Sequence, residues 1–307
     1  MPDPTPRQTA NFKIILTYPS MFNSFVSKQI KTSEATINLV QKGDGYPILF
    51  LHGYPQTHVC WHLVAPILAN HFTVVCTDLR GCGDSSKPAS NGTHLPYSKR
   101  TMALDQVEVM NQLGFTKFAV VAHDRGARVA HRMALDHPTK VEKLALLDII
   151  PTSTAFEKVD KEIATNAFNW FFSIQEDELP ERLINAEATF YLQWCIKHWS
   201  GTKGIPAAEA MREYERCFTA ETIHATCEEF RAAASIDLLH DEADKQKKVS
   251  CPTLLLWSKN SMWASFDIMK IWQSKIEKVE GVAFDCGHFL PEEDPKQTAE
   301  ALMKFLM

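Results

Sequence analysis

The sequence between residues 117 and 138 constrains the fold more than any other stretch. Lys117–Val121 is a short, apolar, partly β-branched run that predicts a buried strand, and the residues after Gly126 have the apolar spacing of a helix. Between strand and helix the chain has to turn sharply, and the small residues Ala122 and Gly126 flank Asp124 there. Such a turn lifts its central side chain above the edge of a sheet, as a nucleophile elbow does. A plain strand-to-helix turn with a capping Asp is the alternative.

Short strand-like runs alternate with helical stretches over most of the chain. Helices are expected at about 58–69, 101–113 and 295–305, and strands at 36–40, 47–51, 72–76, 141–148, 252–257 and 279–284. This alternation predicts an α/β fold, with a mostly parallel central sheet flanked by helices.

The alternation stops between residues 152 and 248, which are rich in Phe, Trp, Glu and Arg at helical spacing and contain no convincing strand. We therefore expect a helical cap over 152–248, inserted after the strand that ends at Asp148. The core would comprise 21–151 and 249–307. Residues 1–20 are rich in Pro and polar side chains, and we expect them to form an N-terminal extension outside the fold.

Composition narrows the class of protein. The net charge of −5 and the pI of about 6.2 disfavour a nucleic-acid or membrane partner. The eight cysteines form no CxxC pair and no metal-binding pattern, as expected of free thiols in a reducing compartment. No signal peptide and no apolar run long enough to span a bilayer is evident. We expect a soluble, cytoplasmic protein without metal or cofactor.

Three residues that can carry chemistry follow predicted strands: Asp124, Asp148 and His288. The carboxyl ends of parallel strands share one edge of the sheet, where ligands bind. The chain order of acid nucleophile, second acid and histidine is the one that this architecture uses for a catalytic triad. Each residue alone has a structural explanation as a turn, a cap or a core histidine, but together they favour catalysis.

Residues 21–307 resemble the α/β-hydrolase superfamily, and within it the fluoroacetate (haloacetate) dehalogenase group and the related epoxide hydrolases. The motifs that carry the resemblance are His52–His58, Asp78–Ser85, His123–Arg128, Leu147–Thr152 and Cys286–Phe289. Epoxide hydrolases and haloalkane dehalogenases usually have Trp after the nucleophilic Asp, whereas Arg125 stands there in this chain, as is typical of the haloacetate enzymes. The resemblance implies a hydrolase that acts on carbon–halide bonds of a small-molecule substrate, and dimers are common in this group.

A carboxylate suits this chemistry better than an unactivated serine hydroxyl. Asp124 would displace halide from saturated carbon to form an alkyl-enzyme ester, which water then hydrolyses. His288 would deprotonate that water, and Asp148 would orient and stabilise the imidazolium. The backbone N–H groups of Tyr54 and Arg125 are expected to form the oxyanion hole.

Two arginines stand beside the nucleophile. Arg125 and Arg128 are three residues apart and fall on one face of the expected helix. They would bind a substrate carboxylate and keep Asp124 ionised, which predicts a short 2-substituted acid as substrate. The alternative is that one or both merely pair with acidic side chains on the surface.

The halide pocket departs from the pattern of the dehalogenase group, which supplies a His-Trp pair and a Tyr from the cap. Here Trp170 keeps the indole donor, Asn169 stands in the place of His, and Phe230 aligns with Tyr and has no donor. Since fluoride needs several donors to leave, we expect slow or absent defluorination and a preference for chloride or bromide.

Two other functions compete with this interpretation. An epoxide hydrolase would use the same Asp-His-Asp set and would need a cap tyrosine such as Tyr191 or Tyr214 to protonate the opening oxygen. A non-catalytic ligand receptor on a hydrolase scaffold is the second alternative. Serine esterase activity is disfavoured because no Ser occupies the turn at Asp124.

Overall fold

The computed structural model describes residues 21–307, so the expected extension over 1–20 lies outside the described residues. Its 8-stranded sheet has the order β1-β2-β4-β3-β5-β6-β7-β8. β2 runs antiparallel to both of its neighbours, and every pair from β4 to β8 is parallel. The strands are β1 (Val26–Lys31), β2 (Thr36–Lys42), β3 (Pro47–Leu51), β4 (Thr73–Thr77), β5 (Phe118–His123), β6 (Val141–Leu147), β7 (Thr253–Ser258) and β8 (Val279–Phe284).

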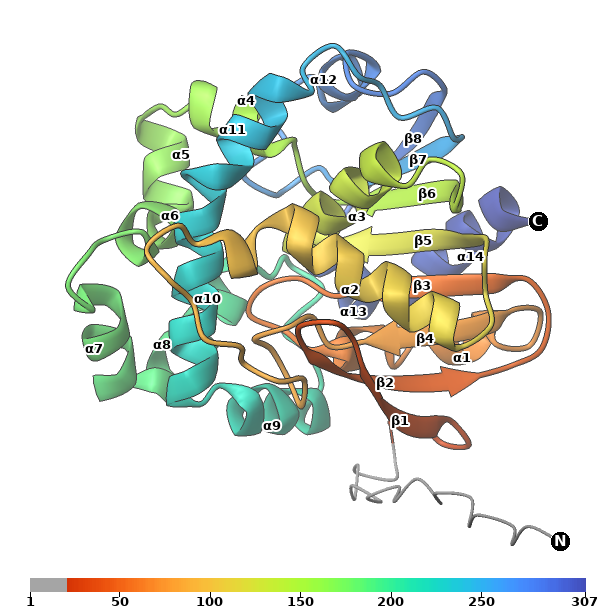
Figure 1. Ribbon diagram of the computed structural model, residues 1–307, viewed down its shortest axis with the longest axis horizontal. Coiled ribbons are helices and arrows are strands. Elements are labelled where there is room, and N and C mark those ends of the chain that lie inside the picture. The colour runs from red at the N-terminus through yellow and green to blue at the C-terminus, as the bar shows by residue number, and fades with distance from the viewer. Residues whose placement is uncertain (1–20) are drawn as a thin grey trace, which may run out of the picture.

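Helices cover both faces of the sheet. α2 (Lys99–Gln112) and α3 (Asp124–Asp136) lie in front of it in Figure 1, and α14 (Pro295–Leu306) lies behind. β4 and β5 are consequently buried along their whole length, which is why they read as apolar runs rather than as alternating ones. The predicted mostly parallel α/β architecture is confirmed.

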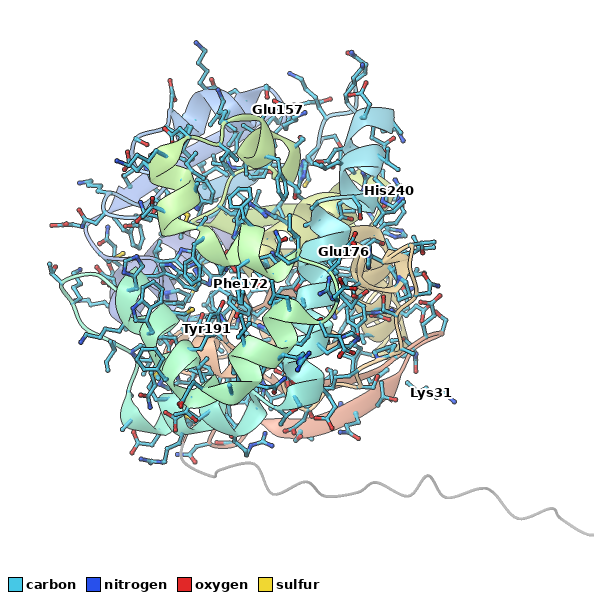
Figure 2. All side chains as sticks on the ribbon, turned by 90° about the vertical axis from the view of Figure 1, so that its left-hand side faces the viewer. Lys31, Glu157, Phe172, Glu176, Tyr191 and His240 are labelled. Carbon is cyan, nitrogen blue, oxygen red and sulfur yellow. The ribbon has the colours of Figure 1, made fainter. Side chains whose placement is uncertain are left out.

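Helices alone connect β6 to β7, as predicted, and we call them the cap. They are α4 (Thr152–Glu157), α5 (Lys161–Asn166), α6 (Phe168–Ser173), α7 (Leu179–Ala186), α8 (Ala188–Trp199), α9 (Ala208–Cys217), α10 (Ala220–Ala233) and α11 (Ile236–Ala243). Figure 2 looks onto this layer, where the green and cyan helices around the labelled Phe172 and Tyr191 lie over the core.

The register of the sheet brings four loops to the edge that faces the cap. Leu51 of β3 pairs with Ala122 of β5, and Ala122 pairs with Leu146 of β6. Leu147 in turn pairs with Leu256 of β7. The loops that follow these strands therefore open side by side, toward the helices on the left of Figure 1.

Two elements differ from the expectations. β1 was not predicted, because VSKQIK has only two apolar side chains and forms the partly exposed edge of the sheet. The helix expected over 58–69 is broken into η1 (His58–Trp61) and α1 (Ala65–Leu68). Pro66, in the first turn of α1, lacks the N–H that a continuous helix would require. The remaining short elements are η2 (Leu95–Tyr97), α12 (Ile268–Gln273) and α13 (Leu290–Glu293).

A buried polar cluster joins cap and core. Nε2 of Gln56, in the loop after β3, donates to the hydroxyl of Tyr214 on α9 at 3.2 Å and also to the carboxyl of Glu292 on α13. Burial raises the pKa of Glu292 to about 8. Because a carboxyl in an unfolded chain titrates near pH 4.3, the folding stability that Glu292 supports declines as the pH rises from there through about 8.

Replacing Glu292 by glutamine removes this titration while keeping the size of the side chain. We expect the melting temperature of Glu292→Gln to be close to that of the wild type at pH 5 and higher than that of the wild type at pH 9. The difference should be roughly 2 °C for each kcal/mol by which the free energy of unfolding differs. Thermal unfolding at the two pH values measures the difference, with the exposed Glu300→Gln as matched control. An offset that is the same at both pH values would contradict the assignment.

Candidate active site

The turn between β5 and α3 holds Asp124 in a conformation that few residues adopt. Its φ is +47°, in the left-handed region. A Cβ on Gly53 would lie 2.5 Å from the Cβ of Asp124, and one on Gly126 would lie 2.3 Å from the backbone oxygen of His52. The two glycines are therefore required by the close approach of the loop after β3 to this turn, which is the predicted nucleophile elbow.

Asp124 is buried, but its surroundings keep it ionised. The backbone N–H of Tyr54 donates to Oδ1 of Asp124 at 2.9 Å. Burial alone would raise the pKa of Asp124, but the nearby His288 and His123 and the backbone N–H groups of Tyr54 and Arg125 lower it below its ordinary value. Both predicted oxyanion-hole N–H groups thus face this carboxylate.

The structure brings the predicted triad together. Nδ1 of His288 lies 2.6 Å from Oδ2 of Asp148, and Nε2 of His288 lies 3.7 Å from Oδ2 of Asp124. Burial opposes protonation of His288, but the hydrogen bond and charge of Asp148 and the charge of Asp124 raise its pKa above 6.5. His288 therefore lies between Asp148, which orients it through a hydrogen bond, and Asp124, to which it has no direct hydrogen bond.

The loop after β7 supports the second acid. Oδ1 of Asp148 accepts hydrogen bonds from the backbone N–H of Ser258 at 2.9 Å and from Oγ of Ser261 at 3.0 Å. That this loop donates to the acid that follows β6 was not anticipated from the sequence. Serines at the carboxyl end of a neighbouring strand were the available signal.

A small cavity lies between core and cap, directly over the nucleophile. Its walls combine Asp124 and His288 of the triad with aromatic side chains of the cap and of the loop after β7. The lining residues are Tyr54, Asp124, Arg125, Asn169, Trp170, Trp199, Phe230, Met262, Trp263 and His288. Trp199, Met262 and Trp263 were not anticipated, because only the folded chain brings α8 and the β7 loop to this wall.

Arg125 lines the cavity with its hydrogen-bonding capacity largely unused. Its side chain is 2% exposed, and its Nε donates to Oε1 of Glu229 at 2.9 Å. Lys99 Nζ lies at 2.9 Å from the same oxygen, and the guanidinium carbon stacks 3.8 Å from the centre of the Phe230 ring. Neither terminal nitrogen of Arg125 has a partner within residues 21–307. Such buried donors are costly unless an anion binds them.

Arg128 also lies close to Asp124 but is not part of the cavity lining. Its guanidinium stacks on Trp170 at 4.2 Å, and burial together with the charge of Arg125 lowers its pKa to about 9. Nε donates to the backbone oxygen of Ile150 at 3.4 Å, and its terminal nitrogens have no partner in the described part of the chain. The alternative that either arginine pairs with surface acids does not match this burial.

The three residues expected at the halide all line the cavity. Asn169 and Trp170 come from α6, and Oδ1 of Asn169 has no hydrogen-bond partner among residues 21–307. Phe230, on α10, packs edge-on against Tyr54, with ring centres 5.4 Å apart. Phe230 thus stacks against the guanidinium of Arg125 and has no group that could donate a hydrogen bond to halide.

The two cap tyrosines considered for epoxide opening do not line the cavity. The hydroxyl of Tyr214 accepts from Gln56 in the cap–core cluster. The hydroxyl of Tyr191 is buried and lies beside the side chain of Tyr54. Tyr54, from the loop after β3, is the tyrosine whose side chain reaches this wall.

No group of three or more His, Cys, Asp or Glu side chains within residues 21–307 is arranged to hold a metal ion. None of the helices in that range has the length and apolar character to cross a membrane.

Comparison with known proteins places this geometry in a family. The alpha/beta hydrolase fold family matches residues 46–295. A fluoroacetate dehalogenase from Burkholderia sp. is 40% identical over 93% of this chain and 95% of its own length. A soluble epoxide hydrolase from Corynebacterium sp. (strain C12) is 33% identical over 91% and 98%.

Among solved structures, ALR0039 from Nostoc sp. PCC 7120 superposes with a TM-score of 0.91 at 54% identity, covering 94% of this chain and 99% of that one. The family match and the superposition agree with the α/β sheet and its helical insertion. The chain is a hydrolase of the dehalogenase and epoxide hydrolase branch and belongs to the α/β-hydrolase fold family.

Proposed function

We propose that this protein is a hydrolytic dehalogenase of short 2-haloacids. The observation that carries the proposal is the buried guanidinium of Arg125: its terminal nitrogens are unpaired among residues 21–307, and Arg125 lines the same cavity as Asp124. A substrate carboxylate satisfies those donors and places its neighbouring carbon beside the nucleophile. The 40% identity to a fluoroacetate dehalogenase supports this choice within the family.

In the first step Oδ2 of Asp124 attacks the carbon that bears the halogen. Oδ1 is held by the N–H of Tyr54, so Oδ2 is the oxygen free to react. The new C–O bond forms as the carbon–halogen bond breaks, and halide leaves with the bonding electrons. The product is an ester of Asp124 that still carries the substrate carboxylate.

In the second step water hydrolyses this ester. His288 accepts a proton from the water, whose oxygen attacks Cγ of Asp124, and Asp148 stabilises the resulting imidazolium. The N–H groups of Tyr54 and Arg125 stabilise the negative charge on Oδ1 in the tetrahedral intermediate. The C–O bond to the substrate then breaks, and the 2-hydroxyacid takes the proton from His288. Asp124 is left as a carboxylic acid that carries the second hydrogen of the water, and it returns to the carboxylate by releasing that proton to solvent.

The cavity offers the departing halide few hydrogen-bond donors. Trp170 and Trp263 each carry one indole N–H and Asn169 carries an amide, whereas Phe230 has no donor. Because fluoride depends on donors more strongly than the larger halides do, chloride and bromide are the favoured leaving groups.

Epoxide hydrolysis is the second candidate, favoured by the 33% identity to a soluble epoxide hydrolase. It would use the same Asp124, His288 and Asp148. Tyr191 and Tyr214 do not line the cavity, so the proton for the opening oxygen has no cap tyrosine as its source. A buried cationic anchor also has no partner on a neutral epoxide, which makes the haloacid the better substrate.

The first prediction separates these reactions. Incubation with bromo-, chloro- and fluoroacetate should release free halide at rates that fall in that order, and styrene oxide should give little diol. Asp124→Asn should abolish halide release because the amide oxygen is a poor nucleophile, while the exposed Asp44→Asn should not change it. Diol formation without halide release would favour the epoxide hydrolase, and neither product would favour a non-catalytic receptor.

A second prediction tests the anchor. Arg125→Met should raise KM for chloroacetate by roughly tenfold or more, because a charge-assisted hydrogen-bonded pair contributes about 1.5–3 kcal/mol. Turnover of neutral chloroacetamide should change much less, and the exposed Arg212→Met serves as control. An equal loss with acid and amide would show that Arg125 does not bind the carboxylate.

A third prediction concerns pH. Asp148 raises the pKa of His288, so Asp148→Asn should lower that pKa and move the acid limb of kcat, which includes hydrolysis of the ester, to lower pH. The same substitution should reduce kcat by roughly 10²-fold or more, since general-base catalysis of the second step weakens. A pH–rate profile for chloroacetate measures both effects. An acid limb that stays in place or moves to higher pH would refute the role of Asp148.

A further inference from the structure

The buried carboxylate of Glu293 accepts hydrogen bonds from the backbone of the loop that carries His288. Oε2 of Glu293, on α13, accepts hydrogen bonds from the backbone N–H of Gly287 at 2.7 Å and of Gly201 at 2.9 Å. Oε1 accepts from the backbone N–H of Phe289 at 3.0 Å. Two of these three donors are the immediate neighbours of His288, and the third belongs to the cap segment that follows α8.

The same cap segment contacts the His288 loop directly. A Cβ on Gly287 would lie 2.0 Å from the backbone nitrogen of Gly201, and a Cβ on Gly201 would lie 2.4 Å from the backbone nitrogen of Gly287. The backbone N–H of His288 donates to the backbone oxygen of Trp199 at 2.9 Å. The two backbones therefore meet with no room for a side chain, and Trp199 at this junction lines the cavity.

We propose that Glu293 is a positioning residue that fastens the His288 loop to the end of α8, so that the cap fixes the place of the general base. This proposal rests on the two-step reaction given above and deepens it. In that reaction His288 takes a proton only when water attacks the ester. Loosening the loop therefore slows hydrolysis and leaves the attack of Asp124 on the substrate nearly unchanged.

Glu293→Gln is the direct test because it keeps the length of the side chain. An amide has one acceptor oxygen, so it satisfies either Phe289 alone or Gly287 and Gly201 together, and its NH2 group faces the remaining N–H. With bromoacetate we expect a rapid burst of one bromide per active site, followed by turnover slower than wild type by roughly 10- to 100-fold. The exposed Glu300→Gln is the matched control.

Two measurements distinguish positioning from general damage. The ester should accumulate as added mass on the Asp124 peptide in Glu293→Gln, as it should in His288→Asn, and the pH profile of the slow phase should change. A purely structural role would reduce the burst and the slow phase together, without accumulation of the ester. That outcome, or turnover equal to wild type, overturns the proposal.

A second variant loosens the junction from the cap side. Gly201→Ala places a methyl group against Gly287 and should give the same burst and slow phase. Gly92→Ala, where a Cβ meets nothing within 4 Å, is its control. If Gly201→Ala slows the burst and the slow phase equally, the junction does not act through His288.

Amide hydrogen exchange gives a readout that does not depend on the reaction. In Glu293→Gln the amides of Gly201, Gly287 and Phe289 should exchange faster than in the wild type, while the amides of β5 stay protected. If the wild type releases no halide, the proposed dehalogenase activity is refuted. The exchange rates of the three amides in Glu293→Gln and wild type then still decide whether Glu293 holds the His288 loop. Unchanged exchange at all three amides would refute the clamp itself.

Discussion

The structure depends on a sharp turn at which Asp124 adopts a positive φ and its backbone is closely packed against the loop after β3. The strain is accepted because the loop after β3 and the first turn of α3 close over it from both sides, at positions where only glycine fits. The sheet register then determines where the other site residues lie, because it places the ends of β3, β6 and β7 at the same edge of the sheet as this turn. A nucleophile, its backbone donors and the supporting acid thus follow from one local geometry.

Burial of charge is the second constraint. Arg125 and Lys99 share Oε1 of Glu229, and Asp237 lies 3.5 Å from Lys99. Each of these groups would be costly to bury alone, and each becomes acceptable beside an opposite charge. This chain of charges crosses from α2 and α3 in the core to α10 and α11 in the cap. It therefore ties the position of the cap to the guanidinium that faces the cavity.

The buried strands, and the site residues that come directly after them, could be predicted from the sequence. β8 has the expected bounds, and Asp124, Asp148 and His288 lie together because each follows a parallel strand, whose ends must share an edge. Glu229, Trp263 and Glu293 could not be found in this way. Their roles depend on contacts between α10 and α3, between the β7 loop and the cap, and between α13 and α8, which no local pattern encodes. The edge strand β1 was missed because its exposed residues lack an apolar run.

The anchoring guanidinium has a consequence for the later part of the proposed reaction. A 2-haloacid, the ester of Asp124 and the 2-hydroxyacid product all keep the same carboxylate, so Arg125 holds each of them about equally well. Such uniform binding captures scarce substrate but gives no acceleration of the chemical steps. It also retains the product, so the 2-hydroxyacid that the reaction forms competes with the next substrate molecule for the same guanidinium.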